Sequence, residues 1–156
     1  MKKQTTGVYL LKDNKILFLV RTKKDDAIHK QGMYLPIGGH VELGEGLEAC
    51  AIREVQEEAG ITVHSVDLRG ILYIRSQNTG DYDLIIFIYT STDFEGEPNS
   101  GREGHFEWVA LDKLKQANLY QGDKIFLDLM LKDKFFIVEF VYKGFELLTH
   151  TIVKLF

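Results

Sequence analysis

The chain has 156 residues, of which 45% are hydrophobic and 27% are charged. Such a length and composition are typical of one globular domain, so we expect residues 1–156 to form a single domain. The net charge of -4 argues against nucleic-acid binding by bulk electrostatics. No stretch reaches the roughly 18 apolar residues that span a bilayer, and the single cysteine cannot form an internal disulfide. We expect a cytoplasmic monomer or homodimer with no nucleic-acid or membrane partner.

The chain opens with two β-rich runs, at residues 5–11 and 16–21. The polar residues 12–15 between them predict a hairpin turn, so the two strands should pair. Arg21 ends the second run and begins a small basic cluster that includes Lys23. These charges are either solvated loop residues or contacts to substrate phosphates, and Arg21 at the strand end is the first choice for such a contact.

Residues 39–61 contain three closely spaced glutamates. Read as a helix over residues 45–59, this stretch places Glu54, Glu57 and Glu58 on one face, at positions i, i+3 and i+4. The three carboxylates repel one another and lie at the negative end of the helix dipole. We therefore expect a cation among them, and ligands that are all oxygen favour Mg²⁺ or Mn²⁺ over zinc. The alternative is a solvated acidic helix.

Glycines border this helix on both sides. Gly38 and Gly39 precede it and allow the backbone to approach a ligand closely. Gly60 follows the helix at the position of a left-handed cap, with Ile61 as the apolar residue after it. The helix is therefore predicted to end at Gly60.

The rest of the chain predicts further strands and two helices. Predicted strands cover residues 62–76, 82–91 and 105–110, with a loop at 77–81 and a turn-rich segment at 94–104. A short helix is predicted at 111–117, a longer one at 123–132, and a terminal hairpin at 135–142 and 145–155. Strands at both ends with helices between them indicate an α+β or α/β sandwich around a mixed sheet.

The acidic stretch resembles the Nudix box, Gly-x5-Glu-x7-Arg-Glu-apolar-x-Glu-Glu-x-Gly-apolar. Every fixed position is filled, by Gly39, Glu45, Arg53, Glu54, Val55, Glu57, Glu58, Gly60 and Ile61. The resemblance implies the Nudix α/β/α sandwich with a central mixed β-sheet. The remainder of the chain more loosely resembles the MutT-type subgroup, which hydrolyses nucleoside triphosphates, including oxidised purine ones.

The same resemblance implies roles for individual residues. The expected metal ligands are one carbonyl and four carboxylates, from Gly38, Glu54, Glu57, Glu58 and Glu103. Glu54 is the first choice for the general base and Glu103 the second. Arg53 is expected to orient Glu45 or Glu57 through a bidentate pair. On composition alone, Glu103 would be read as a solvated acid of the turn-rich loop.

A base-binding site is expected at Tyr120 and Asp123, just before and within the second predicted helix. MutT-type hydrolases place an aromatic residue and an acid here, although the usual aromatic is Trp and one position that is often acidic is Gly122 in this chain. In the alternative interpretation, Asp123 caps or begins the helix and Tyr120 belongs to the core. Leu35 is also expected at the substrate. Some oxidised-purine hydrolases carry an Asn two residues before the glycine pair, where this chain has Leu35-Pro36-Ile37, and this departure leaves the identity of the base open.

These residues predict metal-dependent hydrolysis of a nucleoside triphosphate, for example 8-oxo-dGTP, to a nucleoside monophosphate and pyrophosphate. The box fixes the chemistry and not the leaving group. A nucleoside diphosphate sugar or a dinucleoside polyphosphate therefore stays open as the substrate. A nucleotide-sensing module without catalysis is a further alternative, and the intact box argues against it.

Overall fold

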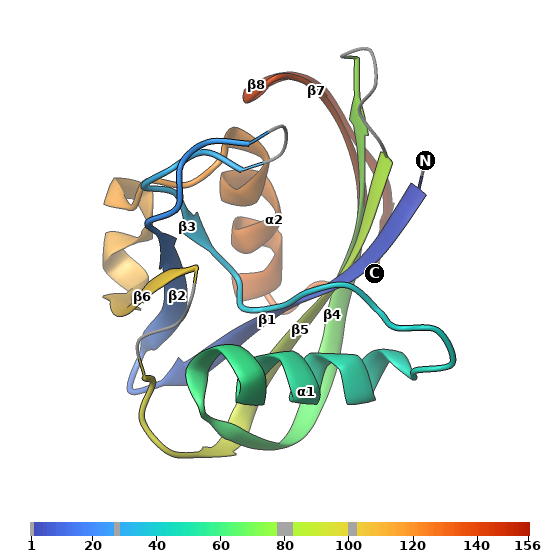
Figure 1. The fold of residues 1–156 in the computed structure, drawn as a ribbon. Helices are drawn as coiled ribbons and strands as arrows, with labels where there is room; N and C mark the ends of the chain where they lie inside the picture. Colours follow the sequence, from blue (N-terminus) through green and yellow to red (C-terminus); the bar gives the residue numbers. More distant parts are fainter. Residues whose placement is uncertain (1, 27–28, 78–82, 100–102) are drawn as a thin grey trace.

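The computed structural model describes residues 2–26, 29–77, 83–99 and 103–156, which form strands β1 to β8, helices α1 and α2 and one 3-10 helix, η1 (Figure 1). The N-terminal elements are β1 (Lys2–Lys12), β2 (Lys15–Arg21), β3 (Tyr34–Leu35), α1 (Leu47–Ala59), β4 (Thr62–Ser76) and β5 (Asp83–Glu95). The C-terminal elements are β6 (Gly104–Ala110), η1 (Leu111–Gln116), α2 (Gln121–Leu131), β7 (Phe136–Lys143) and β8 (Glu146–Leu155). Most of the predicted loop at 77–81 lies outside the described residues.

The sheet is mixed, as the sequence predicts. Its larger part has the strand order β1-β5-β4-β7-β8, in which β1 and β5 are parallel, β4 and β7 are parallel, and the other neighbours are antiparallel. The predicted first hairpin is confirmed, because β1 and β2 pair antiparallel around Asp13 and Asn14. Both turn residues have positive φ, of 52° and 59°, the geometry of a tight hairpin turn. Beyond the turn β2 leaves the larger sheet and pairs with β3 and β6.

The two helices cover opposite faces of the larger sheet (Figure 1). Alternate residues of β1 point to opposite faces, so Val8 packs in the cluster that includes α1, and Tyr9 packs in the cluster that includes α2. In helix α1, Val55 and Ala59 are fully buried against the sheet. On the other face, Phe126 of α2 is buried against the sheet. None of the helices in the described residues is long and apolar enough to cross a membrane.

Both predicted helix starts were wrong by two residues. Helix α1 begins at Leu47 because Gly44 turns the chain with a φ of 80° and Gly46 is still extended, with φ -76° and ψ 154°. Helix α2 begins at Gln121, because Tyr120 is its extended N-cap residue. Glu45 therefore lies in the turn before α1, where its side chain can reach back across the helix.

Smaller differences concern the strands and the short helix. Strand β5 continues four residues past the predicted end, because its polar end pairs with the start of β4, as in Thr62 opposite Glu95. The short helix at residues 111–116 is a 3-10 helix. The two-residue strand β3 was not predicted. The terminal hairpin is confirmed, with β7 and β8 antiparallel around Gly144, whose φ is 61°.

Candidate active site

The glycine pair before α1 lies against β1 and against the acidic helix. The backbone N–H of Thr6 donates to the Gly39 carbonyl at 3.0 Å. A Cβ atom at Gly38 would overlap the Thr6 carbonyl, and one at Gly39 would overlap the carboxyl group of Glu54. Close packing against backbone therefore requires glycine at Gly38, and Gly39 brings the loop directly onto the Glu54 side chain.

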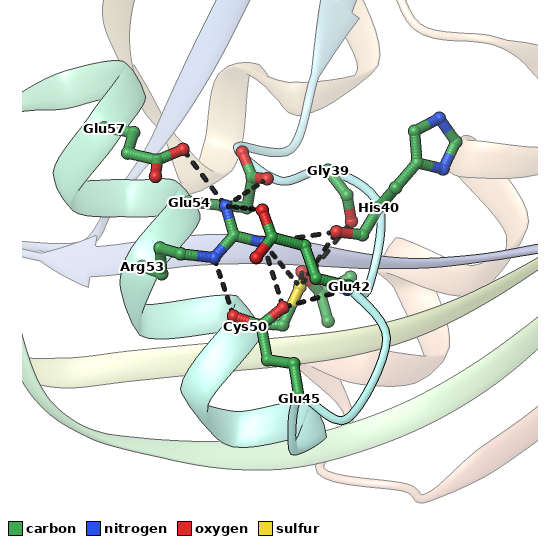
Figure 2. Close-up of polar contacts among 9 residues, drawn as sticks. Gly39, His40, Glu42, Glu45, Cys50, Arg53, Glu54 and Glu57 are labelled. Atoms are coloured by element: carbon green, nitrogen blue, oxygen red, sulfur yellow. Dashed lines mark hydrogen bonds and ion pairs between the residues drawn. The ribbon is translucent and has the colours of Figure 1, made fainter.

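Arg53 connects the carboxylates of the box (Figure 2). Its Nε and Nη2 donate to the two carboxylate oxygens of Glu45 at 2.6 and 2.9 Å, so the bidentate pair forms with Glu45. Its Nη1 donates to Glu54 at 2.9 Å and to Glu57 at 3.1 Å. Its Nη2 also donates to the His40 carbonyl at 3.2 Å. One guanidinium thus ties the loop before α1 to two turns of the helix.

This arrangement affects neighbouring carboxylates differently. The hydrogen bond from Arg53 is the main cause that lowers the pKa of Glu45 to about 2, and the same bond raises the pKa of Arg53. Burial raises the pKa of Glu54; the charges of Glu57 and Glu58 add to this rise, and Arg53 opposes it. Glu54 is therefore more basic than an ordinary glutamate, and a cation bound nearby would relieve the repulsion from its two neighbours.

The five expected metal ligands are not assembled into a cage. Among the residues that the structure describes, no group of three His, Cys, Asp or Glu side chains is placed so that it could hold a metal ion. Glu54 and Glu57 contact Arg53, and the carboxylate of Glu103 lies 4.0 Å from Nζ of Lys23. The donors still fit a hard divalent cation, because all of them are oxygen atoms and because the charges of Glu57 and Glu58 add to the effect of burial in raising the pKa of Glu54.

A pocket of about 430 Å³ lies beside the glycine pair. Gly38, Gly39 and Glu103 line it, and Glu54 packs behind Gly39. The structure brings all of the residues predicted at the substrate to this pocket, namely Arg21, Lys23, Leu35, Tyr120 and Asp123. The walls are completed by apolar residues of β4 and β5 and by Phe145 in the last hairpin turn.

Arg21 is nearly buried, with 6% of its surface exposed. Its Nη2 donates to the Lys24 carbonyl at 2.9 Å and to Asp26 at 3.3 Å. Asp26 also accepts a hydrogen bond from the backbone N–H of His29 at 2.7 Å. Asp26 and His29 both line the pocket, and sequence reasoning missed them. The only signal in the sequence was that the acid Asp26 follows Arg21 by five positions.

Tyr120 is held at the pocket by its hydroxyl and its ring. The hydroxyl accepts a hydrogen bond from the backbone N–H of Lys30 at 2.7 Å, and the ring centroid lies 6.5 Å from that of Phe145. Burial raises the pKa of Tyr120 to about 12. The sequence did not indicate Phe145, which becomes a neighbour of Tyr120 only when the last hairpin folds back over the start of α2.

Asp123 does not cap α2, since the N-cap residue is Tyr120. Instead, its side chain lines the pocket, and burial raises its pKa to about 7. The preceding Gly122 donates its backbone N–H to the Tyr142 hydroxyl at 2.9 Å, and a Cβ atom on Gly122 would overlap that hydroxyl. Tyr142 therefore fills the space in which a second acid would lie.

The mixed sheet between two helices and the Arg53-centred box define a Nudix fold. The model of the NUDIX domain matches residues 1–130, and the chain therefore belongs to the Nudix family. Within that family it is a hydrolase of the MutT type, as the sequence predicted.

Relatives and solved structures agree with this placement. The chain is 31% identical over 118 residues to a zebrafish (Danio rerio) protein named oxidized purine nucleoside triphosphate hydrolase, covering 75% of this chain and 74% of that protein. A MutT protein from Bacillus halodurans superposes with a TM-score of 0.83 and 28% identity, covering 97% of both chains. A Photobacterium profundum protein named NAD-capped RNA hydrolase NudC is 37% identical over 92 residues, which cover 54% of this chain and 33% of that protein.

Proposed function

We propose that this Nudix hydrolase cleaves a nucleoside triphosphate to a nucleoside monophosphate and pyrophosphate. The observation that carries the proposal is the pocket of about 430 Å³, which joins the glycine pair to a buried arginine and to an aromatic wall. Charged groups for phosphates and a flat surface for a base thus occur in one continuous space. The name of the zebrafish relative supports the same substrate class.

Glu54, Glu57, Glu58, Glu103 and the Gly38 carbonyl are the groups that would hold Mg²⁺ or Mn²⁺. When bound, the metal would neutralise phosphate oxygens and polarise the attacking water. Because Glu54 and Glu57 contact Arg53 in the structure, we expect metal binding to redirect these carboxylates while Glu45 keeps the bidentate pair with Arg53. Arg53 then positions the helix carboxylates and does not itself contact the substrate.

The reaction needs a base, and Glu54 is the best candidate because burial raises its pKa. The water oxygen attacks one of the two phosphorus atoms joined by the α–β bridging oxygen, and its proton passes to the Glu54 carboxylate. The bond between that phosphorus and the α–β bridging oxygen breaks, which releases the nucleoside monophosphate and pyrophosphate. Arg21 and Lys23 supply positive charge on the pocket wall for the phosphate chain. Glu103 is the second candidate for the base.

For the base of the nucleotide, Tyr120 and Phe145 offer apolar ring surface and Asp123 offers a polar group. With a pKa of about 7, Asp123 is largely protonated below neutral pH and can then donate a hydrogen bond as well as accept one. Leu35 cannot hydrogen-bond a base edge through its side chain, and Gly122 adds no acid. These departures support a broader base preference than that of a strict oxidised-purine hydrolase.

The test is a hydrolysis screen with Mg²⁺ in which both products are identified. Canonical and oxidised nucleoside triphosphates are compared with sugar nucleotides, dinucleoside polyphosphates and NAD. Release of pyrophosphate from a triphosphate, faster than cleavage of any other class, supports the proposal. Faster cleavage of a sugar nucleotide, a dinucleoside polyphosphate or NAD would instead assign the pocket to that class, and absence of hydrolysis across the panel would favour a sensing module.

A further inference from the structure

Strand β8 forms one edge of the larger sheet, and among the described strands it pairs only with β7. Its apolar side chains are also poorly covered by the rest of the described protein. Four apolar residues of this strand keep two fifths or more of their surface exposed: Leu148 (41%), Ile152 (43%), Val153 (53%) and Leu155 (46%). A long, apolar edge strand is a template for pairing with another strand.

The sequence of β8 is complementary to itself when read in the antiparallel direction. Residues 146–154 are Glu-Leu-Leu-Thr-His-Thr-Ile-Val-Lys, and they are symmetric in chemistry about His150. If two copies of β8 lie antiparallel with His150 opposite His150, each residue meets one of matching type. The resulting pairs are Glu146 with Lys154, Leu147 with Val153, Leu148 with Ile152, and Thr149 with Thr151.

The pairing of β8 with β7 shows which residues share a face of the sheet. Polar residues of β8 lie opposite the β7 residues that alternate away from the core, and these polar residues are Glu146, Thr149, Thr151 and Lys154. Leu147, His150, Ile152 and Leu155 lie opposite buried β7 residues, on the side of α2. In the antiparallel arrangement, Glu146 therefore meets Lys154 and Thr149 meets Thr151 on the same face, as cross-strand contact requires.

Two β-bulges interrupt the pairing of β8 with β7, one at Leu148 and one at Val153. A bulge places two consecutive residues opposite a single partner. The symmetry about His150 brings Leu148 opposite Ile152 and Leu147 opposite Val153. In two copies of β8 paired in this way, the irregular segment at one end of one copy lies opposite the irregular segment at the other end of the second copy. The regular residues 149–151 of one copy lie opposite residues 149–151 of the other.

We propose that two copies of this chain associate through antiparallel pairing of β8 with β8, about a twofold axis at His150. The charge pattern selects a second copy as the occupant of this edge, because each dimer contains two Glu146–Lys154 pairs. Each of these residues has the opposite charge directly across from it and no like charge in register. A closed, isologous contact of this kind uses the same residues of both copies and does not continue into a fibre.

Sedimentation velocity over an about 100-fold dilution series measures the dimer directly. We expect wild-type protein to shift from dimer to monomer on dilution. Glu146→Lys and Lys154→Glu should each raise the dimer dissociation constant by about 10-fold, since each change places two like-charged pairs in register. The double variant restores both opposite-charge pairs and should return the dissociation constant to the wild-type range.

A cysteine cross-link tests the position of the axis. Directly opposed residues in an antiparallel pair have Cα atoms about 4.5–5.5 Å apart, which a disulfide can bridge. His150→Cys should therefore form a covalent dimer under mild oxidation, whereas Lys113→Cys on the exposed side of η1 should not. The native Cys50 is buried and does not interfere.

Four results would overturn the proposal. Wild-type protein could remain monomeric at every concentration. A dimer could form with both charge variants at the wild-type dissociation constant, which would place the contact elsewhere. The double charge variant could fail to restore the dimer, or His150→Cys could cross-link no faster than Lys113→Cys, and either result would exclude this register. Melting temperatures of all variants, measured in parallel, identify any loss that comes from misfolding.

Discussion

The acidic helix and the base pocket are built in different ways. At the helix, Arg53 reaches partners that are at most 13 positions away in the sequence. At the pocket, the hydroxyl of Tyr120 binds a backbone N–H that is 90 positions away, and the lining comes from β2, β3, β4, β5, α2 and the last hairpin turn. The chemistry is thus encoded locally, whereas the recognition surface depends on the whole fold.

Two carboxyl groups, one from each region, have pKa values shifted in opposite directions. A bidentate arginine holds the pKa of Glu45 near 2, whereas burial without such a partner raises the pKa of Asp123 to about 7. The Glu45 carboxylate therefore stays charged and keeps its pair with Arg53. The carboxyl group of the pocket changes its charge near neutral pH, which suits recognition of hydrogen-bonding groups.

The largest expected effect is the loss of hydrolysis when the metal is removed, which tests the acidic helix and not the base pocket. We expect a chelator to abolish hydrolysis, because the crowded carboxylates at Glu54, Glu57 and Glu58 need a cation to act on phosphates, and added Mg²⁺ or Mn²⁺ should restore it. Phosphate or pyrophosphate release in treated and repleted samples measures this. Full activity in metal-free buffer would contradict the mechanism proposed for the helix, but it would not contradict the proposed binding of the base in the pocket.

The next effect distinguishes faces of the same helix. Glu54→Gln or Glu57→Gln should lower kcat by about 100-fold or more, the scale of a lost base or electrostatic group. Glu48→Gln is the matched control, because Glu48 is an exposed residue of the first turn. Steady-state kinetics with Mg²⁺ compare the three variants. Equal losses in all three would mean that the site does not lie on the Glu54 face.

In the pocket, Asp123→Asn should change how stability depends on pH. The raised pKa of about 7 means that the native state keeps a proton that the unfolded chain releases above about pH 4. Wild-type stability should therefore fall as pH rises from about 4 to about 7, by at most about 4 kcal/mol. The Asn variant lacks this loss, so it should be more stable than wild type above pH 7 and equal to it near pH 4.

Denaturant unfolding at several pH values, with chelator present, measures this difference. Asp128→Asn on the same helix is the control, because Asp128 is exposed and pairs with Lys132 at the surface. Its difference from wild type should be small and should not change between pH 5 and 8. If the Asp123 and Asp128 variants behave alike, the carboxyl group of Asp123 is not buried in solution.

Sequence patterns predicted those parts of the molecule that depend on local spacing. The Nudix box, the αL cap at Gly60 and both hairpins needed only short-range rules, and the mixed sheet followed from the order of the elements. The start of α1 at Leu47 was missed because the backbone turn at Gly44 and the extended backbone at Gly46 delay the first helical turn. The start of α2 at Gln121 was missed because the extended residue before the helix is Tyr120. Asp26, His29 and Phe145 were missed because their places in the pocket arise from long-range packing.

The smallest of these effects concerns Tyr120, which the sequence leaves between core and substrate site. Its ring lines the pocket next to Phe145, so Tyr120→Ala should raise KM for a nucleoside triphosphate by about 10-fold, the scale of a lost stacking contact. Hydrolysis of inorganic tripolyphosphate, which has no base to stack, should be unchanged. Tyr120→Phe keeps the ring and removes the hydroxyl that accepts a hydrogen bond from Lys30, so it should raise KM less than the alanine variant does. Equal losses of Tyr120→Ala on both substrates, or a fall in melting temperature that explains the whole loss, would return Tyr120 to the core, and the aromatic surface for the base would then have to come from Phe145.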